Sequence, residues 1–131
     1  MSKQRFVLLL ERLHEATRSG KVRWEETAKE GAFRIALGDG LVRIEKDADF
    51  DAARGSYEFI RASLITRHGE TVDELVASED DEPFDETDQL IEKLYNDART
   101  SALSGDELVD SMLADLKAGK TRALPPDHPQ R

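Results

Sequence analysis

The stretch AFRIALGDGLVRIE, residues 32–45, decides the fold class of this chain. In its first half, from Phe33 onward, every second residue is large and apolar, a period typical of a strand with one buried face. The triplet Gly38-Asp39-Gly40 then predicts a tight turn. Val42 and Ile44 resume the alternation after that turn. The stretch therefore predicts a β-hairpin.

Two more strands are expected after this hairpin. A polar loop follows Glu45, and residues 57–66 are then rich in the aromatic and β-branched side chains that favour strands. His68-Gly69 can turn the chain into a fourth strand at residues 71–76. Because the connections between these neighbours are short, we expect an antiparallel meander rather than crossovers.

Helical periodicity flanks the sheet on both sides. Apolar residues recur at three- and four-residue spacing within residues 6–16, 90–102 and 108–116. Ser104 and Glu107 match a capping box for the last of these helices. The sequence therefore predicts an α+β fold with an N-terminal helix, a four-stranded antiparallel meander, and two C-terminal helices packed on one sheet face.

Length and composition narrow the class of protein. The 131 residues suit one α+β domain, which we assign to residues 1–119, followed by a flexible Pro-rich tail at residues 120–131. There is no Cys, and no apolar run approaches the ~20 residues of a membrane span, so we expect a soluble, cytoplasmic protein. The net charge is −9, and residues 79–98 carry −8 of it. Because Lys and Arg form no basic stripe, nucleic acid is not an expected partner.

The pattern most similar to a metal motif is the segment from Asp47 to Asp51, with Glu58 eleven residues after Asp47. Oxygen ligands at positions one, three, five and twelve have the spacing of a calcium loop. However, Ala52 stands where such a loop uses Gly, and the flanks have the pattern of strands rather than helices. The alternative is a solvated hairpin loop whose Asp residues form turns. We expect no metal site; the candidates for one are Asp47, Asp49, Asp51 and Glu58.

An acidic strip precedes the second helix, with seven carboxylates among the ten residues of 79–88. Such a strip can dock on a basic protein surface, and Phe84 supplies an apolar side chain within it. The alternative is a solvated linker whose acidic end stabilises the start of the helix. The candidate partner contacts in this strip are Glu79, Asp80, Asp81, Glu82 and Phe84.

Two aromatic residues are candidates for either the core or a contact surface. Trp24, the only Trp, can close the first helix onto the sheet or anchor an interface. Tyr95 lies at the margin of the apolar stripe of its helix and can line the rim of a contact surface. The three His residues lie far apart in the sequence, without metal-ligand spacing, and no nucleophile motif is present. We therefore expect no enzyme activity.

Residues 20–27 (GKVRWEET) and 94–103 (LYNDARTSAL) resemble segments of short, acidic bacterial proteins of unassigned activity, built as a helix, a small sheet and helices. The resemblance covers about residues 6–116. It implies a bacterial or phage-associated protein and carries over no functional residue. The chain is also superficially similar to type III secretion chaperones, which are small, acidic, dimeric α/β proteins. It differs from them in placing four strands together before two helices.

These observations favour a non-enzymatic protein-interaction module, with homodimerisation through a sheet edge or a helix stripe as one form of it. The apolar stripes of three helices exceed what one modest sheet can cover, so some apolar surface is expected to remain for a partner. Two alternatives stay open. One is an acidic adaptor or inhibitor that docks on a basic protein surface through residues 79–88, and the other is a calcium-binding domain that uses residues 47–58. No cofactor, nucleic acid or membrane partner is expected.

Overall fold

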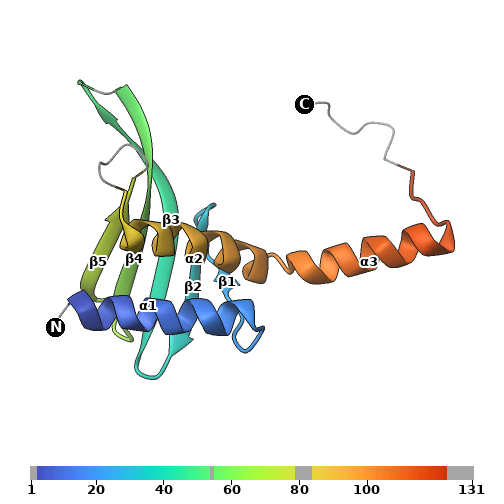
Figure 1. The fold of residues 1–131 in the computed structure, drawn as a ribbon, viewed down its shortest axis with the longest axis horizontal. Helices are drawn as coiled ribbons and strands as arrows, with labels where there is room; N and C mark the ends of the chain where they lie inside the picture. The colour runs from blue at the N-terminus through green and yellow to red at the C-terminus, as the bar shows by residue number, and fades with distance from the viewer. Residues whose placement is uncertain (1–2, 54, 79–83, 124–131) are drawn as a thin grey trace.

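The computed structural model of this protein describes residues 3–53, 55–78 and 84–123 (Figure 1). The helices and strands are α1 (Lys3–Arg18), β1 (Glu25–Glu26), β2 (Ala32–Leu37), β3 (Gly40–Asp51), β4 (Gly55–Thr66), β5 (Thr71–Ala77), α2 (Glu86–Ala102) and α3 (Gly105–Ala118). The α+β class is confirmed, with five strands where the sequence predicts four. No helix in these residues is both long enough and apolar enough to cross a membrane.

The five strands form one antiparallel sheet in the order β1-β2-β3-β4-β5, which is the predicted meander with one added strand. The predicted hairpin forms β2 and β3, where Ile35 pairs with Val42 and places two apolar side chains on the same face. The hairpin turn leads into Gly40, where a Cβ atom would lie only 2.7 Å from the carbonyl oxygen of Ile65 in β4. Glycine is therefore required there for close approach of two strands.

The β3–β4 hairpin is longer than the sequence predicts, because both of its strands extend into the expected loop. The expected polar loop after Glu45 is mostly strand, because β3 continues to Asp51 and β4 already begins at Gly55. Backbone pairing with the aromatic-rich β4 stabilises a strand that an Asp-rich segment does not favour by itself. The added strand, β1, consists only of Glu25 and Glu26, which is too short to show any periodicity.

The core lies between the sheet and two helices. α1 and α2 lie side by side over one face of the sheet (Figure 1). The largest fully buried side chains come from both helices, from the inner sheet face and from the loop after α1: Trp24, Phe6, Leu10, Ile44, Ile91, Leu94 and Val42. Except for Trp24, these residues repeat at helical or strand spacing, which is why the sequence pattern predicts the elements that carry them.

Polar contacts of Trp24 join the two core helices. Its indole Nε1 donates a 2.9 Å hydrogen bond to the hydroxyl of Thr17 in α1. Its backbone N–H donates a 2.9 Å hydrogen bond to the hydroxyl of Ser101 in α2. Both donors are thereby paired inside the core, where an unpaired donor would be costly.

α3 departs from the predicted packing. It extends away from the body of the molecule (Figure 1), and none of its residues is buried, so the prediction that it packs on the sheet is wrong.

The capping box predicted for α3 is also wrong. Ser104 precedes α3 with a left-handed backbone (φ 56°), and its side chain makes no capping hydrogen bond. The Ser104 hydroxyl instead accepts a hydrogen bond from Arg23, which also pairs with Glu107 at 3.0 Å. Most of the predicted tail, residues 124–131, lies outside the described residues.

Candidate functional site

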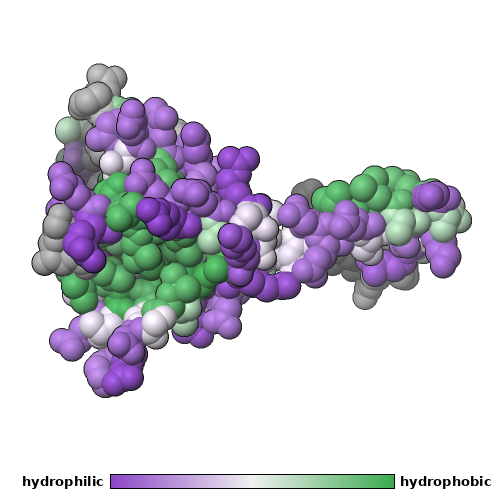
Figure 2. Space-filling view, turned by 60° about the horizontal axis from the view of Figure 1, so that its bottom comes forward, coloured by the Kyte–Doolittle hydropathy of each residue, from purple (hydrophilic) through white to green (hydrophobic). Residues whose placement is uncertain are grey.

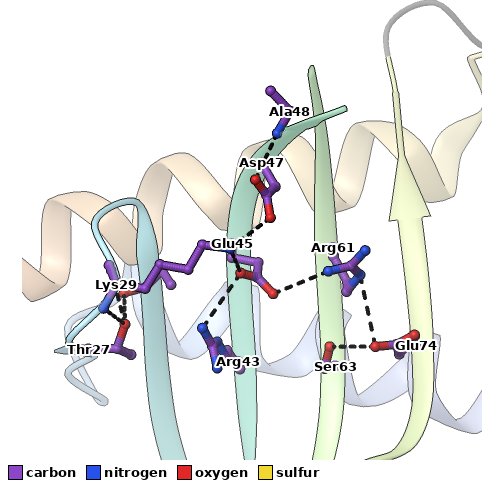
Figure 3. A network of polar contacts seen from close by, with 10 residues as sticks. Thr27, Lys29, Arg43, Glu45, Asp47, Ala48, Arg61, Ser63 and Glu74 are labelled. Carbon is purple, nitrogen blue, oxygen red and sulfur yellow. Dashed lines mark hydrogen bonds and ion pairs between the residues drawn. The ribbon is translucent and has the colours of Figure 1, made fainter. Parts of the chain in front are cut away.

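A charged network lies on the outer face of the sheet, opposite the helices (Figure 3). At its centre, the largely buried carboxylate of Glu45 in β3 accepts a 2.7 Å hydrogen bond from Lys29 Nζ. The guanidinium nitrogens of Arg43 and Arg61 lie 3.6 Å and 3.5 Å from the same carboxylate. Lys29 Nζ also donates a 2.7 Å hydrogen bond to Asp47. Each of these charges therefore has an opposite charge beside it.

The turn between β1 and β2 places Lys29 over this network. The Thr27 hydroxyl lies within hydrogen-bond distance of the Lys29 carbonyl oxygen (3.1 Å) and the Ala32 carbonyl oxygen (3.0 Å), and it accepts from the Lys29 N–H (3.2 Å). Short hydroxyl side chains commonly stabilise turns in this way. The Gly31 carbonyl accepts a 3.0 Å hydrogen bond from the N–H of Lys46, which ties the turn to β3.

The network keeps its members ionised. Burial acts to raise the pKa of Glu45, but the hydrogen bond from Lys29 and the charges of Arg43, Lys29 and Arg61 outweigh it, so this pKa lies below its ordinary value. The Lys29 hydrogen bond also lowers the pKa of Asp47. The bonds to Asp47 and Glu45 in turn raise the pKa of Lys29. All three shifts favour the ionised forms, as expected for a network of ion pairs.

A cleft of about 460 Å³ lies beside the β3–β4 hairpin. Strand residues including Lys46 and Glu58 form part of its lining. Phe84, from the segment before α2, and Glu92 of α2 complete it. The Lys46 ammonium also lies 5.3 Å from the centre of the Tyr95 ring, a cation–π distance. Phe84 is half-buried and lines this cleft. The lining mixes charges of both signs with apolar surface and predicts no particular reaction.

The structure does not bring the four calcium candidates together. Asp47, Asp49 and Asp51 alternate along β3 and lie on one face of the strand. Glu58 pairs directly with Ala48, and paired residues share a face, so Glu58 lies on the opposite face from the Asp residues. Within the part of the chain that the structure describes, no group of three or more His, Cys, Asp or Glu is arranged to hold a metal ion.

The acidic strip is only partly described. Glu79, Asp80, Asp81 and Glu82 lie outside the described residues, so docking through residues 79–88 stays a prediction. At the described end, the Asp85 side chain accepts from the Asp88 N–H at 2.9 Å, and the Asp88 carboxylate accepts from the Asp85 N–H at 3.1 Å. These two carboxylates cap α2, which is the role that the linker alternative assigns to them.

The two aromatic candidates for a contact surface belong to the core. Trp24 and Tyr95 are 1% and 5% exposed, so neither presents a surface to a partner in this structure. The Tyr95 ring packs at 5.8 Å between centroids against Phe33 of β2. Both rings bury more apolar area here than they could at the rim of a contact.

One pair of residues that the sequence did not indicate joins α1 to α2. His14 Nε2 and Asp97 Oδ2 lie 2.8 Å apart, and Arg18 Nε lies 3.8 Å from the same carboxylate oxygen. His14 and Asp97 are separated by more than eighty residues in the sequence. No local pattern could therefore reveal the pair.

α3 carries a group of large apolar side chains that are exposed to solvent. Among the residues that the structure places, eleven large apolar side chains are exposed, and five of them belong to α3. These five are Leu108, Val109, Met112, Leu113 and Leu116, between 53% and 71% exposed, and we call them the α3 stripe. Their spacing puts them on one side of the helix, and Figure 2 shows apolar surface along the projecting helix.

A second apolar surface lies on the body. Figure 2, which brings the lower side of Figure 1 forward, shows a continuous apolar area on the side where α1 runs. α1 contributes Leu8, which is 47% exposed, and half-buried Leu9. We call these two residues and the apolar surface around them the α1 patch. Comparison of the chain with protein-family models, curated proteins and solved structures gives no match.

Proposed function

We propose that this chain is a non-enzymatic protein-interaction module that docks through the α3 stripe. The observation that carries the proposal is an amphipathic helix whose entire apolar side lies in solvent. Large exposed apolar patches on a folded protein mark contact sites for partners. The resemblance to acidic bacterial proteins supports a bacterial or phage origin for this module.

The length of α3 also supports a docking role. A helix of 14 residues without tertiary packing is only marginally stable in water. Its large apolar side chains therefore contribute little to the stability of the isolated chain. They become stabilising only when another surface buries them. We expect α3 to fray in the free chain and to become protected when it docks.

The charge of α3 favours a protein over a membrane as the partner. α3 contains four carboxylates and one Lys, so its net charge is −3. Helices that lie on membranes carry Lys and Arg on their polar face, because they bind anionic lipid. An acidic polar face instead suits a protein surface with positive charge around an apolar centre.

The test compares two neighbouring substitutions on the full chain. Leu113→Ser removes an apolar side chain from the stripe, whereas Ala114→Ser places the same residue on the opposite side of the helix. We expect immobilised wild-type protein and Ala114→Ser to retain the same partner from extracts of the source cells. Leu113→Ser should lose that partner, because it removes about 1.5–3 kcal/mol of apolar burial.

Hydrogen exchange on the same complexes supplies a direct readout. Amide exchange in α3 should slow when the partner is bound, and exchange in α2 should change little because α2 is already packed. Equal retention of the partner by all three proteins, with unchanged exchange in α3, would count against the proposal.

A further inference from the structure

We infer that the partner of α3 is a second copy of the same chain, in a reciprocal dimer where each α3 covers the α1 patch of the other copy. This inference rests on the proposed function, since it identifies the occupant of the same stripe. It follows from three features of the structure: the direction of α3, the charges of α1 and α3, and the apolar area that the two surfaces offer.

The direction of α3 separates the two apolar surfaces within one chain. Only Leu103 and Ser104 lie between α2 and α3, and the N–H groups of both are bonded to carbonyls of α2. Arg23 binds the Ser104 hydroxyl and the Glu107 carboxylate, which fixes the start of α3. α3 therefore leads away from the α1 side of its own body (Figure 1). A second copy can bring a stripe to each patch without any change in this joint.

The charges favour α1 over α3 as the surface that receives the stripe. α1 contains four basic and two acidic residues, a net charge of +2, whereas the net charge of α3 is −3. Arg5 and Arg12 of α1 are exposed. Docking of α3 beside α1 pairs opposite charges around an apolar centre. Pairing of two α3 helices through their stripes would instead bring together two segments of net charge −3.

The available area favours two docking contacts over one. Five side chains of the size of Leu, about half to two-thirds exposed, offer on the order of 300 Å² of apolar surface, and a matching patch loses a similar area. One such contact buries roughly 600 Å², which is the size of a crystal-packing contact, whereas stable interfaces begin near 1,200 Å². A reciprocal dimer contains the contact twice and reaches that value.

Sedimentation equilibrium of the full chain tests the association. We expect a dimer at micromolar concentration. Leu113→Ser should weaken it about tenfold for each of the two docking contacts, so roughly 100-fold in total. Ala114→Ser should leave the dissociation constant unchanged. Because Leu113 is exposed in the free chain, loss of folding does not explain the expected change. A dimer that is insensitive to Leu113→Ser would overturn this inference, and the proposed function would then depend on stripe-dependent retention of a different protein.

Disulfide trapping identifies the surfaces. The chain has no Cys, so Leu8→Cys and Met112→Cys each create a single thiol. Oxidation of an equimolar mixture should give mainly the mixed 8–112 product. A predominant 112–112 product would show that two α3 helices pair with each other and would overturn the inference. A monomeric wild-type chain would overturn it as well. In that case, stripe-dependent retention of a different cellular protein would leave the proposed function standing.

Salt dependence separates the same two arrangements independently. Raising the salt concentration to about 1 M shortens the screening length to ~3 Å and weakens exposed charge interactions. A dimer of α3 on α1 should therefore dissociate more readily at high salt. A dimer of α3 on α3 should become tighter, because screening reduces repulsion between like charges. Tighter association at high salt would contradict the inference.

Discussion

α2 and α3 follow each other in the chain with similar apolar periodicity, yet the structure covers only one of them. α2 buries four residues, Ile91, Leu94, Tyr95 and Ala98, against α1 and the sheet, and Asp85 caps its start. α3 buries none, and its start has no side-chain cap. The apolar periodicity of a helix therefore shows which face tends to be buried. It does not show whether another element of the chain or a partner buries that face.

The largest expected effect comes from truncating one Leu in each helix. Leu94→Ala should lower the free energy of unfolding by about 2–5 kcal/mol, because it opens a cavity in the core. Leu113→Ala should change it by less than ~0.5 kcal/mol at concentrations where the chain is monomeric, since this side chain contacts mainly water. Urea denaturation followed by circular dichroism measures both. Equal losses would mean that α3 packs on its own chain after all.

A smaller effect tests the polar contact that ties Trp24 to α1. Thr17→Val removes the acceptor of the Trp24 indole N–H and leaves that donor buried without a partner, which should cost about 1–3 kcal/mol. Urea denaturation measures the loss, and the fluorescence of the single Trp reports on the changed contact. Thr100→Val, the same change at an exposed position of α2, is the control and should cost much less. A wild-type value for Thr17→Val would show that water replaces the lost acceptor.

The same contrast explains how much of the structure could be predicted from the sequence. The β2–β3 hairpin and the core-facing stripes of α1 and α2 are predicted correctly, because each repeats one apolar face at a fixed period. The helix over residues 108–116 is predicted, but its position is not, since periodicity carries no information about tertiary packing. β1 is missed because two residues have no period.

The candidate sites were harder to predict because they depend on register and on contacts between distant residues. The spacing of Asp47, Asp49 and Glu58 suggests convergence only if the backbone forms a loop, and strand pairing places Glu58 on the other face. The contact of His14 with Asp97 joins two helices across 83 positions of the sequence. The exposure of the α3 stripe became evident only from the structure, in which no other element of the described residues covers it.

Acid should destabilise the body of the molecule through the charged network on the outer face of the sheet. Because the pKa of Glu45 is lowered in the folded chain, its stabilising contribution is present above the pKa of an unfolded Glu, about 4.3. That contribution is lost as the pH falls below this value through the folded pKa. Glu45→Gln should cost roughly 1–2 kcal/mol at neutral pH and remove part of the acid sensitivity.

Urea denaturation at several pH values between neutrality and about pH 3 measures this effect. Glu25→Gln is the matched control, since this exposed carboxylate lies 3.6 Å from Arg34 on the same sheet face and should contribute little. If Glu45→Gln loses as much free energy of unfolding in acid as the wild type does, other carboxylates are responsible for that loss.

The smallest effect on stability should come from Arg23, although Arg23 holds the joint that separates α2 from α3. Its contacts with Glu107 and Ser104 are exposed, so Arg23→Ala should cost less than ~1 kcal/mol. The direction of α3 should nevertheless become less defined. Energy transfer from Trp24 to a dye on Met112→Cys can measure this, because the chain contains one Trp and no Cys. We expect a broader distance distribution in Arg23→Ala.

Arg18→Ala is the control for this measurement, since Arg18 is an exposed residue that contacts Asp97 of α2 rather than α3. It should leave the distance distribution unchanged. If Arg23 keeps α3 away from its own body, Arg23→Ala should also weaken the reciprocal dimer without altering the α3 stripe or the α1 patch, because a less defined helix loses more freedom on docking. A narrow distance distribution together with an unchanged dimer would assign the direction of α3 to the backbone of Leu103 and Ser104 alone.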